Sequence, residues 1–362
     1  MDKKKIIIFG STGNVGSYLT LYAKNFFDPE KYEVIASGRR ETKLFDQYDI
    51  PYCRVDLSKK EDFDVLPQKN VHAVMLLAAT IPSYMDEYDP RLYMNSIVVG
   101  GLNVLEYCRK VKADRILFTQ TVFDVAEYSP DEIIHPYVSP KFSYTGDHAM
   151  YVICKNMMIE MIKHYHLEYG IKSFIFRLPT IYSYSPYHYY FPKGVKTMRP
   201  FYKQIFRAIN SEPLEIWGDP NEAKDMVHVY DFSQMLCKAT LVDREEGFYN
   251  IGTGKPVTQQ EQCQAIIDVF SPKDNPSTIK YIPTNSAGVG YFKMDIQNAI
   301  DELGYAPQYD VHKLYEQYKE EMVVDRFMEF RDESQKSSAK KVGGGYNWLI
   351  ISDRYFLTRR AA

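Results

Sequence analysis

The sequence has few of the features that mark disulfide-rich, zinc-binding or membrane-spanning proteins. Its five cysteines lie far apart and form no CxxC pair: Cys53, Cys108, Cys154, Cys237 and Cys263. This argues against a zinc ribbon or a disulfide framework and is typical of a protein of the reducing cytoplasm. No apolar run approaches the roughly 20 residues needed to span a bilayer, and the run in "MDKKKIIIFG" is too short for a signal-peptide core. We therefore expect a cytoplasmic protein with no membrane partner.

An excess of charge of one sign is also missing. The 44 Lys and Arg residues nearly balance the 47 Asp and Glu residues, for a formal charge of -3, which gives no electrostatic reason to expect a nucleic-acid partner. His164 and His166 would diverge by about 200° on a helix, so no metal site is expected there. A chain of 362 residues can form one large domain or two closely joined ones.

Apolar strands and amphipathic helices alternate through the first half of the chain. Short apolar runs predict strands, and the segments with helical spacing between them predict helices. The strands are expected at 5–10, 32–38, 53–58, 72–80 and 115–121, and helices at 16–27 and 91–111. This alternation predicts an α/β fold, a doubly wound Rossmann-type parallel sheet with helices on both faces.

The first strand runs into a glycine-rich turn, "GSTGNVG", which opens the first helix. Gly10 permits a tight turn, Gly13 lets the backbone approach a pyrophosphate, and Gly16 lets the helix pack closely on the strand. The free N–H groups and partial positive charge of the helix N-terminus favour phosphates. The turn therefore predicts a dinucleotide-binding site.

The end of the second strand bears on which dinucleotide is bound. Enzymes that use NAD place an acidic residue here for the ribose 2′-hydroxyl, but this chain has Gly38, followed by Arg39 and Arg40. Guanidinium groups pair bidentately with phosphates, which favours the 2′-phosphate of NADP. Two solvated arginines and NAD as cofactor are the alternative.

Tyr151 and Lys155, in the segment "YVICK", lie four residues apart in a predicted helix and share one face. A phenol has an ordinary pKa near 10 and is a poor base at neutral pH, whereas a neighbouring ammonium lowers that pKa. The pair is therefore a candidate acid/base site, with a solvated lysine beside a packed tyrosine as the alternative.

In this order and context, the motifs resemble the extended short-chain dehydrogenases, the NAD(P)-dependent epimerase/dehydratase family. The resemblance covers about residues 5–320 and includes "GSTGNVG", the Thr121–Tyr151–Lys155 series, "RLPTIY" at 177–182, and "FYNIG". It implies that Thr121 holds the substrate oxygen, that Tyr151 transfers the proton and that Lys155 binds the nicotinamide ribose. It also implies cofactor contacts from Gly10, Thr12, Gly13, Asn14, Val15, Gly16, Arg39, Arg40, Asp56, Leu57, Ala78, Ala79, Asn95, Tyr151, Lys155 and Pro179, and substrate contacts from Thr80, Tyr182 and Lys224.

Two positions depart from the family pattern. Cys154 stands where the family commonly has Ser before the lysine, and we interpret it as a packing residue. The sugar 4,6-dehydratases of the family carry an Asp-Glu pair directly after the strand-end Thr, where this chain has Val122 and Phe123. Those side chains cannot transfer protons, which argues against dehydratase activity. Asp124 could serve only if the register were shifted.

Three further segments lead to structural predictions. Asp231 is interpreted as the N-cap of a helix, and Thr258 to Glu261 has capping-box spacing. The tyrosine-rich stretch at 181–191 is interpreted as a substrate loop. The alternative, left open, is a surface packed against another chain or simply a covered loop. Residues 331–362 contain a polar, glycine-rich linker and an apolar end whose role the sequence does not reveal.

The resemblance implies a cofactor domain mainly within 1–180 and a smaller C-terminal substrate-binding portion mainly within 181–330, with the chain crossing back near 225–255. The expected function is hydride transfer on a nucleoside-diphosphate sugar, as an epimerase, with Tyr151 as acid/base. An NADPH-dependent reductase of a sugar or other small carbonyl is the alternative, and a non-catalytic dinucleotide-binding regulator or scaffold is a third possibility. A homodimer is a further expectation of the family.

Overall fold

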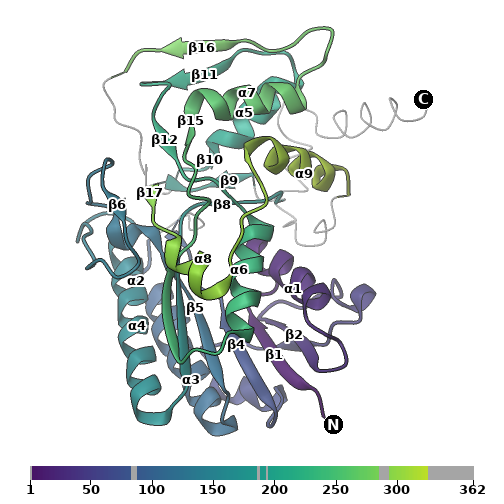
Figure 1. Ribbon diagram of the computed structural model, residues 1–362, viewed down its shortest axis with the longest axis vertical. Helices are drawn as coiled ribbons and strands as arrows, with labels where there is room; N and C mark the ends of the chain where they lie inside the picture. Colours follow the sequence, from purple (N-terminus) through teal and green to yellow (C-terminus); the bar gives the residue numbers. More distant parts are fainter. Residues whose placement is uncertain (1, 83–87, 186–187, 193–194, 285–292, 325–362) are drawn as a thin grey trace.

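The computed structural model describes residues 2–82, 88–185, 188–192, 195–284 and 293–324. Figure 1 shows a larger body, in which a sheet lies between helices and the N-terminus is at the base, and a smaller part stacked on one end of that sheet. The end in question is the carboxyl end of the strands, where ligands bind in open α/β sheets.

The large sheet has seven strands, all parallel, in the order β14-β7-β5-β4-β1-β2-β3. Its strands are β1 (Lys4–Phe9), β2 (Tyr32–Gly38), β3 (Tyr52–Arg54), β4 (Val71–Leu76), β5 (Arg115–Thr121), β7 (Lys172–Leu178) and β14 (Glu246–Asn250). Most residues of the inner strands are apolar and buried, since both faces of the sheet are covered, whereas the edge strand β3 is half-buried to exposed. The predicted doubly wound Rossmann-type sheet is confirmed.

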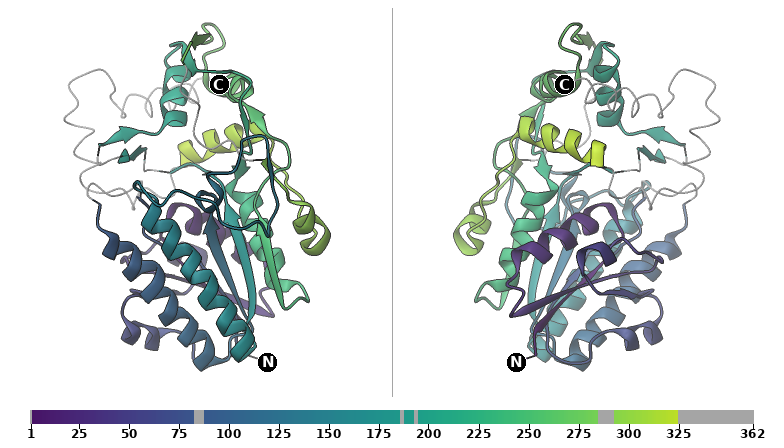
Figure 2. Two further views of the ribbon diagram at one scale, coloured as in Figure 1. Left: turned by 90° about the vertical axis from the view of Figure 1, so that its left-hand side faces the viewer. Right: turned by 90° about the vertical axis from the view of Figure 1, so that its right-hand side faces the viewer.

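Helices cover both faces of this sheet (Figure 2), and an apolar core lies on each face. α3 (Gly100–Val111) and α4 (Ala149–Tyr169) pack on one face, while α1 (Asn14–Phe26), α6 (Val229–Leu241) and α8 (Gln297–Leu303) pack on the other. Short 3-10 turns, η1 (Asp46–Tyr48), η2 (Lys60–Val65) and η5 (Val122–Val125), connect the larger elements.

The helix expected at 91–111 is interrupted. α2 (Pro90–Tyr93) leads into a π-helical segment, η4 (Met94–Val99), and only then into α3. The N–H of Gly100 donates to the carbonyl of Asn95, five residues back. A π segment inserts one residue into the turn and shifts the faces of the flanking helices, which the apolar periodicity of the sequence does not reveal.

The smaller part is built from short strand pairs and three helices around a third core. The pairs are β8 (Ile181–Tyr182) with β13 (Val227–His228), β9 (Tyr189–Tyr190) with β10 (Thr197–Met198), β11 (Leu214–Trp217) with β16 (Ile279–Ile282), and β12 (Ala223–Lys224) with β15 (Val257–Thr258). The helices are α5 (Pro200–Ile209), α7 (Gln259–Phe270) and α9 (Val311–Val324). At the edge of the large body, β6 (Ile133–Ile134) pairs with β17 (Lys293–Met294).

The predictions for helix ends fared differently. The capping box of Thr258 and Glu261 at the start of α7 is confirmed. The N-cap prediction for Asp231 is wrong, because α6 begins at Val229 and its N-cap is His228. The Asp231 carboxylate, in the first turn, instead accepts hydrogen bonds from the N–H groups of Gln308 and Tyr309, at 2.7 and 3.1 Å. This aspartate therefore ties a distant segment to α6.

Residues 331–362, whose role the sequence left open, lie outside the described residues. Within the described part of the chain, no helix combines the length and the apolar character needed to cross a membrane.

Candidate cofactor and active site

At the glycine turn, backbone segments approach one another closely. Gly10 has a φ of +95°, and a side chain there would meet the backbone nitrogen of Ala78 at 2.8 Å. A Cβ on Gly16 would lie 2.1 Å from the carbonyl oxygen of Gly10. The turn between β1 and α1 can therefore be made only with glycine at these two positions.

The start of α1 has the properties of an anion site. Gly13 is its N-cap residue and offers no side-chain cap, and the first turn holds no acidic residue. Asn14 Oδ1 is buried and has no hydrogen-bond partner within the described chain. Free backbone N–H groups, the helix dipole and a bare glycine turn together fit the diphosphate of a dinucleotide. Half-buried Val15 follows on the same helix.

The end of β2 has Gly38 at the position where an acidic residue commonly binds a ribose. A Cβ on Gly38 would meet Thr12 Oγ1 at 2.7 Å and the Tyr52 hydroxyl at 3.3 Å. Tyr52 donates to the carbonyls of Gly38 and Arg40, at 2.8 and 2.5 Å, and so fixes the backbone of this turn. Arg39 and Arg40 follow Gly38 in the chain and are both exposed.

The loop after β3 is pinned to α3. Asn103 Nδ2 donates to the carbonyl of Leu57 at 2.7 Å, and a Cβ on Gly100 would lie 2.8 Å from Leu57 Cβ. Burial acts to raise the pKa of Asp56, but hydrogen bonds from Ser58 and the charges of Lys59 and Arg39 hold it below its usual value. Asp56, which the resemblance assigns to the cofactor site, is thus a carboxylate held by local hydrogen bonds.

The segment after β4 passes beside the glycine turn. Ala78 and Ala79 are half-buried, and the N–H of Thr80 donates to Ser96 Oγ at 3.1 Å. Ser96 in turn donates to the carbonyl of Leu92 at 2.7 Å. Ser96, in the π-helical segment, therefore holds this loop. Asn95, the residue before Ser96, is exposed. Ser96 carries no sequence motif, so its role was not predicted.

The structure brings Thr121 and Tyr151 together. Thr121 ends β5 and Tyr151 lies in the first turn of α4, with 6% and 8% of their surfaces exposed. Burial raises the pKa of the Tyr151 phenol, and a hydrogen bond with the Thr121 side chain acts against this. A hydroxyl pair at the carboxyl end of the sheet is suited to hold one substrate oxygen.

Lys155 lies one turn further along α4 and is 2% exposed. Its Nζ donates to the carbonyl of Thr119 at 2.6 Å and lies 5.8 Å from the centroid of the Tyr151 ring. Burial lowers the pKa of this lysine to about 7. The expectation that Lys155 lowers the pKa of Tyr151 is wrong for the chain alone, because burial dominates both groups.

Two aromatic side chains border this pair and were not predicted as site residues. Tyr93 is fully buried, its ring lies 6.1 Å from that of Tyr151, and its hydroxyl has no partner among the described residues. His148, the N-cap residue of α4, lies with its ring 4.1 Å from Phe123. Cys154 is fully buried with its sulfur 3.5 Å from that of Met94, which confirms the packing interpretation.

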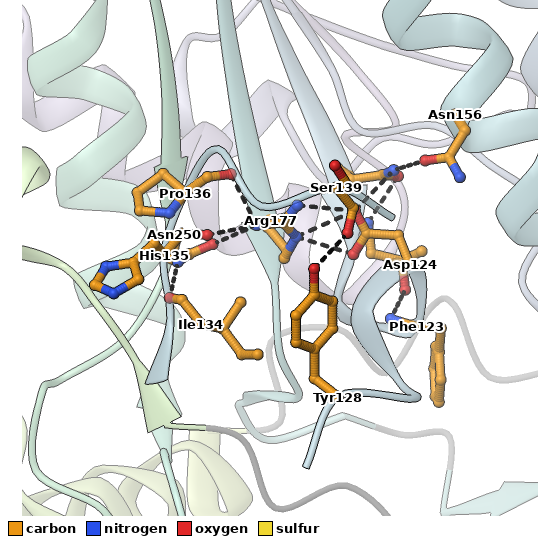
Figure 3. A network of polar contacts seen from close by, with 12 residues as sticks. Phe123, Asp124, Tyr128, Ile134, His135, Pro136, Ser139, Asn156, Arg177 and Asn250 are labelled. Atoms are coloured by element: carbon orange, nitrogen blue, oxygen red, sulfur yellow. Dashed lines mark hydrogen bonds and ion pairs between the residues drawn. The ribbon is translucent and has the colours of Figure 1, made fainter. Parts of the chain in front are cut away.

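Asp124 is held in a buried ion pair. The guanidinium of Arg177 donates to both its carboxylate oxygens, at 2.9 to 3.1 Å, and both residues are 1% exposed (Figure 3). Burial raises the pKa of Asp124, while the charge and hydrogen bonds of Arg177 oppose that effect. A carboxylate so enclosed takes part in packing and leaves Val122 and Phe123 next to Thr121.

The substrate-binding residues expected in the smaller part differ in how deeply they are buried. Tyr182 is 3% exposed and belongs to the third core, with its ring centroid 5.5 Å from that of Phe201, and its role in substrate binding stays a prediction. Lys224 is half-buried, with its Nζ 5.9 Å from the centroid of the Tyr182 ring. Pro179, between β7 and β8, is also half-buried. In the tyrosine-rich stretch, Tyr184 is also buried, whereas 186–187 lie outside the described residues.

Comparison with known proteins agrees with this geometry. A model of the NAD dependent epimerase/dehydratase family matches residues 6–252. The chain belongs to this family. The resemblance inferred from the motifs is thereby confirmed, and the match begins in β1 and ends just after β14.

Members of this family with different reactions are similar to the chain. A putative UDP-glucose 4-epimerase of Methanocaldococcus jannaschii is 25% identical over 313 residues, which are 84% of this chain and 94% of that protein. A dTDP-glucose 4,6-dehydratase of Xanthomonas campestris is 25% identical over 231 residues, 61% of this chain and 63% of that protein. The family is thus shown, while the individual reaction is a separate question.

The fold is shared with solved structures. That of a UDP-glucose 4-epimerase of Thermus thermophilus in complex with NAD has a TM-score of 0.67 and 19% identity, covering 90% of this chain and all of that chain.

Proposed function

We propose that this protein is a nucleotide-sugar 4-epimerase or closely related oxidoreductase in which Tyr151 exchanges a proton with a substrate hydroxyl. The observation that carries the proposal is the buried Thr121–Tyr151 pair with Lys155 one turn away, at the same sheet edge as the glycine turn. The substrate class is taken from the names of the similar proteins, which include epimerases and dehydratases of nucleotide sugars.

Each of the three residues has a distinct task. Thr121 orients the sugar oxygen, and Tyr151 takes its proton or returns it. When bound, a nicotinamide dinucleotide supplies the hydride acceptor and donor and, when oxidised, a positive charge. Because burial raises the pKa of Tyr151 in the chain alone, a nearby positive charge is required before the phenol can act as a base. Lys155, with a pKa of about 7, supplies such a charge when it is protonated.

The surroundings of Thr121 support epimerisation or reduction over dehydration. Elimination of water needs an acid and a base beside the sugar, but Val122 and Phe123 are apolar and Asp124 is locked against Arg177. An epimerase needs only reversible hydride transfer and a substrate that can turn over in the site. A similar protein with the name of a 4-epimerase supports the epimerase as the first candidate.

The cofactor is proposed to be NADP. The end of β2 carries Gly38 in place of an acidic residue, and the exposed Arg39 and Arg40 follow it. This arrangement also supports the second candidate, an NADPH-dependent reductase of a sugar or another small carbonyl compound. Because the structurally similar Thermus thermophilus epimerase is in complex with NAD, NAD is the alternative cofactor.

The test is Tyr151→Phe in the full chain, assayed with NADP or NAD against a panel of UDP- and dTDP-sugars by NMR of the products. We expect turnover to fall by about 10²- to 10⁴-fold, with cofactor affinity within about twofold of wild type. Tyr107→Phe is the matched control. Tyr107 lies on α3 and is also buried, but its hydroxyl donates to the carbonyl of Pro67. Undiminished turnover in Tyr151→Phe would refute the mechanism.

The products distinguish the candidates. Interconversion of two sugars without added reductant supports the epimerase, and consumption of one equivalent of NADPH per product supports the reductase. Cofactor binding without turnover of any sugar would instead support the non-catalytic regulator.

A homodimer is also proposed, from an apolar surface on α3 and α4 and the segment before α3. Apolar side chains there are 38–47% exposed: Leu92, Val99, Leu102, Ile153 and Met157. Apolar patches of this kind mark interaction surfaces. Light scattering should give twice the chain mass of 42.2 kDa, and a mass of one chain at micromolar concentration would contradict the dimer.

A further inference from the structure

A chain of buried polar side chains crosses the carboxyl end of the sheet directly beside Thr121. Figure 3 shows it running from Asn250 through Arg177 and Asp124 toward Asn156. These residues come from β14, β7, η5 and α4, so the chain links four separate elements. Buried polar groups are costly unless every partner is in place, and a network of this kind fixes the relative position of its elements.

Arg177 is the anchor of the network. Besides its contacts to Asp124, its Nη1 donates to Asn250 Oδ1 at 2.9 Å and to the carbonyl of Pro136 at 3.0 Å. Its guanidinium carbon lies 4.7 Å from the centroid of the Phe248 ring. Asn250 also donates to the carbonyl of Ile134 at 2.6 Å. The arginine is thus held from three sides and gives the Asp124 carboxylate a fixed location.

Gln120 connects this anchor to the proposed active site. It is 1% exposed, and its Nε2 donates to Asn156 Oδ1 at 2.6 Å and to Asp124 Oδ2 at 3.4 Å. Its Oε1 accepts the backbone N–H of Thr121 at 2.9 Å. One amide therefore contacts Thr121 on one side and the residue next to Lys155 on the other.

The direction of the Gln120 amide is dictated by its neighbours. Asp124 is a carboxylate paired with a cation, so it accepts hydrogen bonds, and the Thr121 N–H can only donate. The Gln120 NH₂ group must therefore face Asp124 and Asn156, and its oxygen must face Thr121. No other orientation of this side chain satisfies both contacts.

We propose that Gln120 is a positioning residue, which sets the separation and orientation of the Thr121 hydroxyl relative to Tyr151 and Lys155 on α4. The inference rests on the proposed function for its effect on turnover. Gln120 touches neither substrate nor proton; it acts by fixing the turn at which β5 ends and the first two turns of α4. A displacement of about 1 Å between reacting groups costs about 10²-fold in rate.

The experiment compares Gln120→Leu, which removes both contacts, and Gln120→Glu, which retains them only while protonated. The matched control is Thr240→Val, since Thr240 is fully buried and its hydroxyl bonds within α6, on the opposite face of the sheet. The first readout is hydrogen exchange of the Thr121 amide by NMR in the protein without added ligand. Gln120→Leu should raise that exchange rate by about tenfold or more, because the buried N–H loses its acceptor.

The second readout is steady-state kinetics with the substrate identified for the wild-type protein. We expect kcat of Gln120→Leu to fall by about 10- to 100-fold, with KM and cofactor affinity within about twofold. For Gln120→Glu, the ratio of its kcat to that of wild type should rise as pH falls, since only the neutral acid can both accept from Thr121 and donate to Asn156. In Gln120→Leu this ratio should not depend on pH.

Wild-type kcat in Gln120→Leu, or an equal loss in Thr240→Val, would overturn the proposal. If the wild-type protein turns over no sugar, the proposed function fails while the positioning of Thr121 is still decided by amide exchange: faster exchange supports it and unchanged exchange overturns it.

Discussion

Two cations, Lys155 and Arg177, are buried at the same edge of the same sheet, but their surroundings are opposite. Arg177 is 1% exposed and has a carboxylate, an amide oxygen and a backbone carbonyl as acceptors. Lys155 is 2% exposed and donates to the single carbonyl of Thr119, and no carboxylate of the described chain lies within 4 Å of its Nζ. Burial lowers the pKa of Lys155 to about 7.

The difference separates a structural charge from a chemical one. A buried cation with a matching anion and full hydrogen bonding keeps its charge and fixes its neighbours. A buried cation without an anion is destabilised and can release its proton near neutral pH, which is the property an acid/base site needs. The paired Arg177 thus contributes to the shape of the sheet edge, whereas the unpaired Lys155 contributes to its acid/base chemistry.

Breaking the paired side of this comparison should have the largest effect on stability. Arg177→Met leaves the Asp124 carboxylate buried without its cation, and we expect a loss of about 3–5 kcal/mol in the free energy of unfolding. Urea denaturation followed by circular dichroism at pH 7.5 measures this loss.

The double variant Arg177→Met with Asp124→Leu is the control for the charge. Because it removes both ions, it should recover most of the stability lost in the single variant. A double variant no more stable than Arg177→Met would show that packing and the contacts to Pro136 and Asn250, and not the lost charge balance, account for the effect.

Removal of the unpaired cation, Lys155, should change the free energy of unfolding in the opposite direction. Lys155→Met removes a buried amine whose pKa is displaced from 10.5 to about 7, a displacement that corresponds to about 5 kcal/mol at most. We expect the variant to be more stable than wild type at pH 7 by about 2–3 kcal/mol. The gain is smaller than the upper limit because the buried Thr119 carbonyl loses its hydrogen-bond donor. Turnover should be lost.

The pH dependence checks the cause of this gain. The folded pKa lies below the unfolded one, so the unfolded chain binds the proton more readily between pH 7 and 10.5. Wild-type stability should therefore rise with pH across that window relative to Lys155→Met, and the difference between the two should be largest near pH 7 and below. A difference that is constant from pH 7 to 10 would contradict the lowered pKa of Lys155.

The sequence predicted the unpaired side better than the paired one. Tyr151 and Lys155 share a helix face, so their spacing alone brings them together, and the glycine turn is equally local. Arg177 and Asn250 lie in strands, and Asp124 lies in the turn η5 that follows β5. These elements are far apart in the chain, and the pairing of β7 with β5 and β14 makes them neighbours. No periodicity carries that information.

The failed predictions have the same origin. Asp231 was assigned as an N-cap from its position before a helical pattern, but its partners, Gln308 and Tyr309, come from a segment more than 70 residues away. The lowered pKa of Tyr151 was inferred from an adjacent lysine, whereas burial in the core on the α3 and α4 face of the sheet raises that pKa. Proximity along a helix can be read from a sequence, but the extent of burial cannot.

A third cation sharpens the comparison with the smallest expected change in stability. Arg39 is exposed at the end of β2, so its charge is solvated and costs the fold little. Arg39→Ala should change the free energy of unfolding by less than about 0.5 kcal/mol.

If the proposed cofactor is correct, the affinity of Arg39→Ala for NADP should fall by about tenfold while that for NAD stays within twofold, because only NADP carries the 2′-phosphate. Fluorescence titration with the two cofactors measures both affinities, and Lys31→Ala, which removes an exposed cation paired with Asp28 before β2, is the control. Equal losses for NADP and NAD would mean that Arg39 reads the shared part of the dinucleotide, and the 2′-phosphate would then have to be bound elsewhere or not at all.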